Sequence, residues 1–174
     1  MGPPPDPGLL SLYDRALPEV YGYMLARCGS STLAEDLTAE TFLAAVHAEN
    51  GGRGPTTIPW LIGTARHKLV DHWRSREREE RSLRLLEGGR ADGGRVEDPW
   101  DVELDVLHAQ QVLAGLSPAH RAVLTLRYLD DLPVPQVAAL VGRTLHATEA
   151  LLVRARTAFR RGYGTDAESS GGAP

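Results

Sequence analysis

The stretch VPQVAALVGRTLHATEALLVRA, from Val134 to Ala155, has the order of a helix-turn-helix: a short helix, a turn containing Gly142 and a longer helix. Apolar residues recur at helical spacing on both sides of the turn: Val137, Ala138 and Leu140 are expected to face inward, and Leu145, Leu151 and Leu152 to seat the second helix. Ordinary helical hairpins can show this pattern as well. The arginines from Arg154 to Arg161 favour DNA binding, because they can hold phosphates while the start of the helix meets base edges.

The exposed arc of the second helix has unusual chemistry. Helices that enter the major groove usually carry basic residues there, whereas this one carries His146, Glu149, Ala150 and Val153. A glutamate can accept a hydrogen bond from cytosine N4, and alanine or valine can touch a thymine methyl group. We therefore expect a DNA reader with altered specificity and weaker electrostatic attraction.

Charge is distributed unevenly along the 174 residues. The net charge of −4 argues against a surface coated with nucleic-acid-binding charge. Basic residues nevertheless gather in two segments, Arg66 to Arg84 and Arg143 to Arg161, while acidic residues gather in Glu35 to Glu49 and Asp92 to Asp105. Two basic segments suggest two contacts with an anionic polymer. Solvated helix faces are the alternative.

Several function classes lack their sequence signals. The apolar runs are too short to span a bilayer, the start shows no secretory signal, and Cys28 is the only cysteine, which excludes an internal disulfide and a cysteine-based zinc site. His67 and His72 flank Asp71, but five residues apart on a helix their side chains diverge by about 140°. Phosphate loops and nucleophile elbows are not found. We expect a cytoplasmic protein that is not an enzyme and has no metal or cofactor.

Helical periodicity predicts an all-α chain of two small domains. The expected helices are 9–27 (kinked or broken at Pro18), 33–48, 59–86, 102–116, 118–129, 135–141 and 145–161. Gly29 should end the first helix, Thr32 and Glu35 should cap the second, and Ser117 with Pro118 should start the fifth. The domains are 9–86 and 102–163, with a Gly-rich acidic linker at 87–101 and disordered ends at 1–8 and 164–174.

Two of these helices have well-defined faces. In helix 33–48 the expected buried residues are Leu33, Leu37, Phe42 (or Thr41), Ala45 and Val46, and the outer ones are Glu35, Asp36, Ala39, Glu40 and Leu43. In helix 59–86 the apolar stripe is Ile62, Ala65, Leu69 and Trp73, opposite Trp60, Thr64, His67, Asp71 and Arg74. A tryptophan on the wet face suggests either a cap on a neighbouring helix or a stacking surface.

Two blocks of the sequence together resemble one known family. LYDRALPEVYGYMLARCG, AEDLTAETFLAAVHA and PWLIGTARHKLVDHWRSR are similar to domain 2 of the extracytoplasmic-function (ECF) sigma factors of bacterial RNA polymerase, and LSPAHRAVLTLRYLDDLPVPQVAALVGRTLHATEALLVRARTAFRR is similar to their domain 4. The resemblance covers about residues 9–161. It implies an all-α, non-enzymatic protein that directs core polymerase to promoters and is commonly held inactive by an anti-sigma partner.

The resemblance implies roles for particular residues. DLTAETF would dock on the β′ clamp coiled coil through Asp36, Glu40 and Phe42, with Ala39 in place of the more common glutamine. The −10 element would meet Trp60, Arg66, His67, Arg74 and Arg76, with an unstacked base received by the loop RGPTTIP. His67 stands where asparagine is frequent, which affects the preferred base.

Domain 4 would then bind the −35 duplex and the β flap of the polymerase. The residues assigned to the −35 duplex are Arg143, His146, Glu149, Ala150, Val153, Arg154 and Arg160. Two other functions remain open: a sigma-like interaction protein that binds polymerase or a regulator without initiating transcription, and, less well supported, a duplex-binding repressor.

Overall fold

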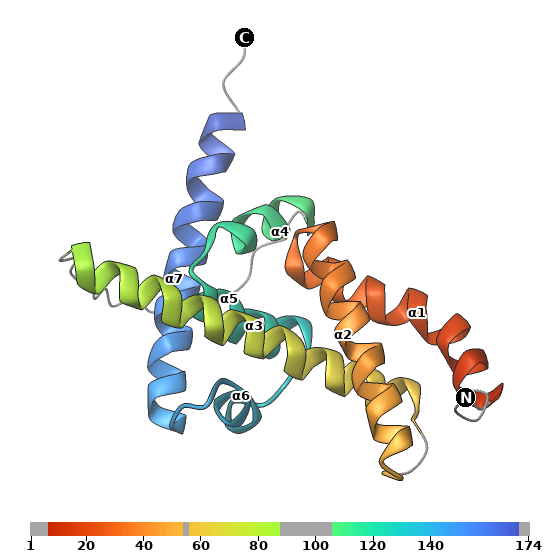
Figure 1. Cartoon of the computed structure of the whole chain (residues 1–174). Coiled ribbons are helices and arrows are strands. Elements are labelled where there is room, and N and C mark those ends of the chain that lie inside the picture. The colour runs from red at the N-terminus through yellow and green to blue at the C-terminus, as the bar shows by residue number, and fades with distance from the viewer. Residues whose placement is uncertain (1–6, 54–55, 88–105, 171–174) are drawn as a thin grey trace. The chain divides into compact units, whose positions relative to one another are not determined.

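The computed structural model of the chain describes residues 7–53, 56–87 and 106–170 (Figure 1). The helices are α1 (Pro7–Cys28), α2 (Ser31–Asn50), α3 (Ile58–Glu87), α4 (Val106–Gly115), α5 (Pro118–Leu124), α6 (Val134–Val141) and α7 (Leu145–Ser170), with a π-helical turn (Thr125–Leu129) after α5. Since these ranges contain helices and no strand, the predicted all-α class is confirmed.

The chain divides into two compact units, Met1–Asp71 and His72–Pro174. The division falls within α3, which begins in the first unit and ends in the second. The sequence places the domain boundary at 87–101, and nearly all of that segment, like most of the expected disordered start at 1–8, lies outside the described residues. Both expectations therefore remain predictions.

The core of the first unit is built on a four-residue repeat in α1. Leu12, Ala16, Val20, Met24 and Cys28 are all buried, and this stripe packs against α2. The expected break at Pro18 does not occur, because α1 continues to Cys28 with the proline inside it. Pro18 lies on the exposed side, where its ring does not interrupt the buried stripe.

Short-range signals set the start of α2, although not at the predicted residue. Gly29 ends α1 with a φ of 66°, as expected. The N-cap is Ser30, whose Oγ accepts a hydrogen bond from the Leu33 amide at 3.4 Å, so the prediction of Thr32 is wrong by two residues. Val46 was expected in the core and is 39% exposed, because it lies about 100° around the helix from buried Ala45.

The second unit has its core between α5, α6 and α7. Ser117 Oγ accepts from the His120 amide at 3.4 Å and Pro118 is the first helical residue, as predicted. The core residues include Val123, Leu126, Val137, Leu151 and Leu152. Leu145 was expected to seat α7, but it is the first residue of that helix and is 47% exposed.

The last helix is longer than the sequence predicts. Its expected end is Arg161, but α7 continues to Ser170. Gly162 lies against α4 so closely that an added Cβ would be 2.8 Å from Val112 Cγ1, and the Tyr163 ring stacks on His108 at 4.3 Å. Packing against α4 therefore extends the helix past a glycine, whose own helix propensity is poor.

Candidate nucleic-acid interface

The outer face of α2 is acidic with one large apolar side chain. Asp36, Ala39 and Glu40 are exposed, as predicted, and Leu43 is 59% exposed one turn further along. Two carboxylates four residues apart point to the same side of a helix. Together with Leu43, they form a small surface suited to a partner that is both basic and apolar.

Phe42, the third predicted docking residue, lies inside the unit instead. Its side chain is 9% exposed and meets the Tyr13 ring edge-on, with 4.7 Å between the ring centroids. A ring in this position supports α2 from behind and is not available to a partner. The exposed residues of this face are therefore Asp36, Glu40 and Leu43, whereas Phe42 lies in the core, as its helical position predicts, and is not available for the docking role that the resemblance implies.

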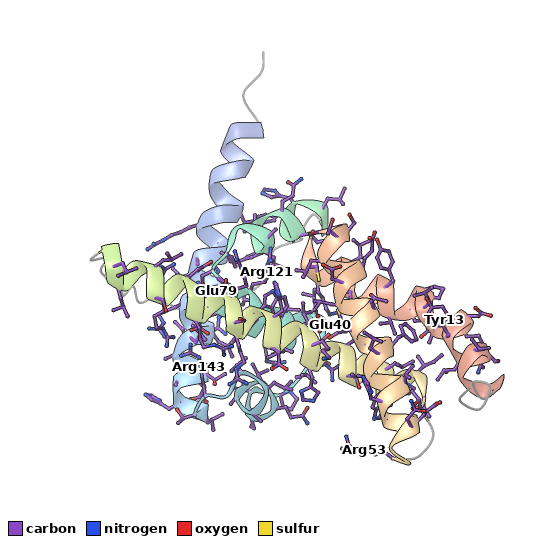
Figure 2. The ribbon with its side chains drawn as sticks, viewed as in Figure 1. Tyr13, Glu40, Arg53, Glu79, Arg121 and Arg143 are labelled. Carbon is purple, nitrogen blue, oxygen red and sulfur yellow. The ribbon has the colours of Figure 1, made fainter. Side chains whose placement is uncertain are left out.

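A groove of about 680 Å³ runs between α2 and α3. Trp60, 39% exposed, contributes to its α3 wall, which confirms the prediction that this tryptophan faces water. Its other lining residues include Glu40, His47, Arg53, Thr64 and Lys68. Figure 2 labels Glu40 on α2 and Arg53 just beyond the end of that helix.

Lys68 links the two walls of this groove. Its Nζ lies 3.6 Å from Glu40 Oε2, and both side chains are partly exposed. Sequence analysis missed Lys68 and Arg53, yet a signal for Lys68 was present: positions 60, 64 and 68 repeat every four residues and share one helix face. An aromatic ring with two cations beside it suits a single nucleic-acid strand, because bases stack and phosphates pair with cations.

The other residues predicted for the −10 element are not gathered in this groove. Arg66 lies about 120° around α3 from Trp60, and His67 is exposed but is not in the groove wall. Arg74 and Arg76 belong to the second unit. There the Arg74 guanidinium lies against Gly142, and Arg76 Nη1 pairs with Glu79 Oε2 at 3.3 Å.

The helix-turn-helix has the geometry that its sequence predicts. Gly142 ends α6 with a φ of 69°, a conformation that residues with a Cβ rarely adopt. Thr144 caps the start of α7, since its Oγ1 accepts a hydrogen bond from the Ala147 amide at 3.2 Å. The turn therefore rests on two local features, one at each helix end.

The predicted −35 residues divide into an exposed arc and two flanking arginines. His146, Glu149, Ala150 and Arg154 are exposed, and Val153 is half-buried on the same side of α7. Arg160 lies about 10 Å further along that side. Arg143 is different: its side chain is 28% exposed and forms an ion pair with Glu77 of α3. Arg143 is labelled beside the start of α7 in Figure 2.

One histidine in the second unit has an altered pKa. Burial lowers the pKa of His120 below its ordinary value of 6.5, Arg154 and Arg84 lower it further, and Glu77 opposes them. Residues 7–53, 56–87 and 106–170 hold no group of three His, Cys, Asp or Glu side chains that could bind a metal. None of the helices in these ranges is long and apolar enough to cross a membrane.

The fold and the helix-turn-helix define a class of transcription protein, and family comparisons match it in two parts. Residues 12–79 match the model of sigma-70 region 2, and residues 109–159 match the model of sigma-70 region 4. The two matches have the predicted order along the chain. Among solved structures, the fold is similar to that of the sigma factor RpoE from Bartonella quintana in complex with the anti-sigma factor NepR, with a TM-score of 0.53 at 20% identity over 90% of this chain and 97% of that chain.

Sequence identity to curated relatives identifies the family within this class of transcription protein. The chain is 31% identical to the ECF RNA polymerase sigma factor SigL of Mycobacterium tuberculosis over 138 residues, 76% of this chain and 75% of SigL. It is 33% identical to the ECF RNA polymerase sigma factor BldN of Streptomyces coelicolor over 150 residues, which are 83% of this chain but only 56% of BldN. The chain belongs to the ECF sigma factor family, as the sequence predicts.

Proposed function

We propose that this protein binds core RNA polymerase and directs it to promoters by contacts with the −10 and −35 elements. It acts as a non-enzymatic polymerase subunit, needs no cofactor, and works in the cytoplasm, where polymerase and chromosome meet. An anti-sigma protein is its proposed regulator.

The observation that carries this proposal is that one residue of the first unit, Glu40, belongs to two functional surfaces. Glu40 belongs to the acidic face of α2, and it also lines the groove that contains Trp60. A protein-docking face next to a site for a single strand is what a factor needs to hold melted DNA on an enzyme. A duplex-binding repressor needs neither.

Polymerase docking is assigned to Asp36, Glu40 and Leu43, against the β′ clamp coiled coil. Reversing both charges (Asp36→Lys with Glu40→Lys) places like charges against a basic partner and should weaken binding to purified core polymerase by roughly a hundredfold, as for several close charge pairs at an interface. Affinity is measured by fluorescence anisotropy with labelled protein, and circular dichroism reports the helix content.

The matched control reverses two exposed acidic residues of α1, Asp14→Lys with Glu19→Lys. It makes the same change in net charge away from α2 and should leave core binding within about twofold, because screened charges contribute little at a distance. Equal losses in both variants would show a general charge effect and refute the docking assignment.

The groove is assigned to an unstacked base of the −10 strand. Trp60 would supply the stacking surface, while Lys68 and Arg53 would meet phosphates. Trp60→Ala should weaken binding of a single-stranded −10 oligonucleotide by the polymerase complex by about 1–3 kcal/mol, and Trp60→Phe should restore part of it. The roles of Arg66, His67, Arg74 and Arg76 at this element stay predictions.

The exposed arc of α7 is assigned to the −35 duplex and the rest of its domain to the β flap. His146, Glu149, Ala150 and Val153 would face base edges, and Arg143, Arg154 and Arg160 would face phosphates. Such a division matches the usual one, in which phosphate contacts position a protein and base contacts specify the sequence.

The alternative function is a sigma-like protein that binds polymerase without starting transcription. Transcription in vitro with purified core polymerase and fragmented genomic DNA separates the two. Discrete transcripts that depend on this protein are expected. Tight core binding without any such transcript would favour the alternative.

A further inference from the structure

The turn of the helix-turn-helix is in contact with the last part of α3. Glu77 Oε1 accepts hydrogen bonds from Arg143 and, at 2.8 Å, from Arg81 Nη2 on its own helix. The side chains of Glu77 and Arg143 are only 23% and 28% exposed, so this ion pair is partly withdrawn from water. All three residues belong to the second unit.

A second contact holds α3 at the same turn. The Arg74 guanidinium lies so close to Gly142 that an added Cβ there would be 2.9 Å from Arg74 Nη2. Gly142 therefore serves two purposes: it permits the left-handed bend and it leaves room for Arg74. Arg74 and Glu77 are three residues apart, so they project from the same side of α3.

The space next to the ion pair is a cavity of about 550 Å³. Its lining residues include Glu77, Glu80 and Arg84 of α3, His120 of α5, and Arg154 and Arg161 of α7. The cavity therefore brings two carboxylates of α3 together with Arg154, which is assigned to a DNA phosphate. A cavity of this volume admits a small ligand but not a duplex.

A carboxylate and a phosphate compete for the same guanidinium. A carboxylate is planar and a phosphate is tetrahedral, but arginine recognises the oxygens of both through paired N–H donors. The ion pair with Glu77 neutralises the charge of Arg143 and occupies part of its guanidinium, so a DNA phosphate binds fully only when the pair opens. A site that is open for only a fraction of the time binds more weakly by that fraction.

We propose that residues 74–84 of α3 form an intramolecular cover over the phosphate-binding arginines of the helix-turn-helix, with the Glu77 carboxylate in the place of a DNA phosphate. The cover lowers DNA binding by the free protein, and its release exposes Arg143. This inference rests on the proposed role of Arg143 at the −35 element, and the experiment below tests the two separately.

The test compares Glu77→Gln with Glu79→Gln in the full-length protein. Both remove one negative charge from the same helix, but the partners of Glu79 among the described residues are its neighbours Ser75 and Arg76, and Glu79 does not line the cavity. Binding of a short fluorescein-labelled duplex of mixed sequence is followed by anisotropy at several salt concentrations, since phosphate contacts do not depend on sequence.

Glu77→Gln should tighten binding roughly fivefold at low salt, and Glu79→Gln by less than about twofold, since an exposed pair contributes little. The gain should shrink as salt rises, because screening weakens the covering ion pair. Equal gains for both variants, or no gain for Glu77→Gln, would overturn the proposal.

Arg143→Ala identifies which assumption fails. It should weaken duplex binding, and in its background Glu77→Gln should do no more than Glu79→Gln, because the pair is already broken. If Arg143→Ala leaves binding unchanged, the −35 assignment of Arg143 is wrong. If it weakens binding but the effect of Glu77→Gln persists in its background, the residue binds DNA and Glu77 does not cover it.

Discussion

The two longest helices, α3 and α7, both contain an arginine-rich segment, but they hold those arginines differently. In α3 the carboxylates come three or four residues from the arginines, giving the pairs Arg76–Glu79, Arg81–Glu77 and Arg84–Glu80. In α7 the only acidic residue before Arg161 is Glu149, and Arg154 has no carboxylate partner among the described residues. Local pairing, more than the number of arginines, decides which helix can attract phosphates.

The ends of these helices also differ in what supports them. The last turns of α3 leave Leu83, Leu85 and Leu86 at least 59% exposed, so they depend on ion pairs within the helix. The part of α7 that follows its arginines instead packs through Gly162 and Tyr163 on α4. Ion pairs of this type contribute a few tenths of a kcal/mol each, whereas close packing contributes more.

The sharpest test of this comparison concerns Glu149, the lone carboxylate of the α7 arc. Glu149→Lys should change the preferred base at one position of the −35 element, with about 1–3 kcal/mol of discrimination, and should tighten non-specific binding. Selection of −35 sequences by both proteins at fixed salt measures this. Glu79→Lys on α3 makes the same charge change and should leave the preferred sequence as it is. Identical selections with Glu149→Lys would show that this residue does not touch bases.

Removing one arginine from each helix tests the effect of pairing. Arg154→Ala should weaken duplex binding roughly tenfold on all sequences and reduce the slope of log affinity against log salt by about 1. Arg76→Ala should have a smaller effect, because Glu79 already neutralises this side chain. Titrations with duplex at several salt concentrations give both quantities. Equal slopes for the two variants would contradict the distinction between paired and unpaired arginines.

Two glycines near the end of α7 test its support by packing. Gly162→Ala places a methyl group against Val112 and should lower the free energy of unfolding by about 1 kcal/mol, the overpacking cost less the gain in helix propensity. Gly164 has no atom within 4 Å of an added Cβ, so Gly164→Ala should be neutral or slightly stabilising. Thermal unfolding of the full chain measures both. Stabilisation by Gly162→Ala would mean that α7 does not pack on α4 at this point.

The smallest expected effect is the titration of His120, which lies near arginines of both helices. Burial and then Arg154 and Arg84 lower its pKa, so folding favours the neutral imidazole. The unfolded chain takes up the proton near pH 6.5 and the folded protein only at lower pH, so stability falls as the pH decreases through this window. Histidine NMR titration should show the lowered pKa. Arg154→Ala should raise the pKa of His120 more than Arg84→Ala does, because Arg84 pairs with Glu80. A larger rise with Arg84→Ala would contradict the distinction between the paired arginines of α3 and Arg154 of α7.

The features that follow from the sequence alone are those that depend on neighbours along the chain. The all-α class, the left-handed stops at Gly29 and Gly142 and the start of α5 at Ser117 follow from periodicity and from hydrogen bonds between residues a turn apart. The two sigma regions and the exposed faces of α2 and α3 were predictable for the same reason, and so were the positions of Asp36, Glu40 and Trp60 on those faces.

Tertiary structure decided whatever depends on residues far apart in the sequence. It set the Tyr13 ring against Phe42, brought Lys68 to Glu40, and extended α7 past Gly162 by contact with α4. It also paired Arg143 with a carboxylate 66 positions earlier. Periodicity shows that a side chain is exposed on its own helix but not which other helix will meet it, because that depends on packing between elements that no local pattern encodes.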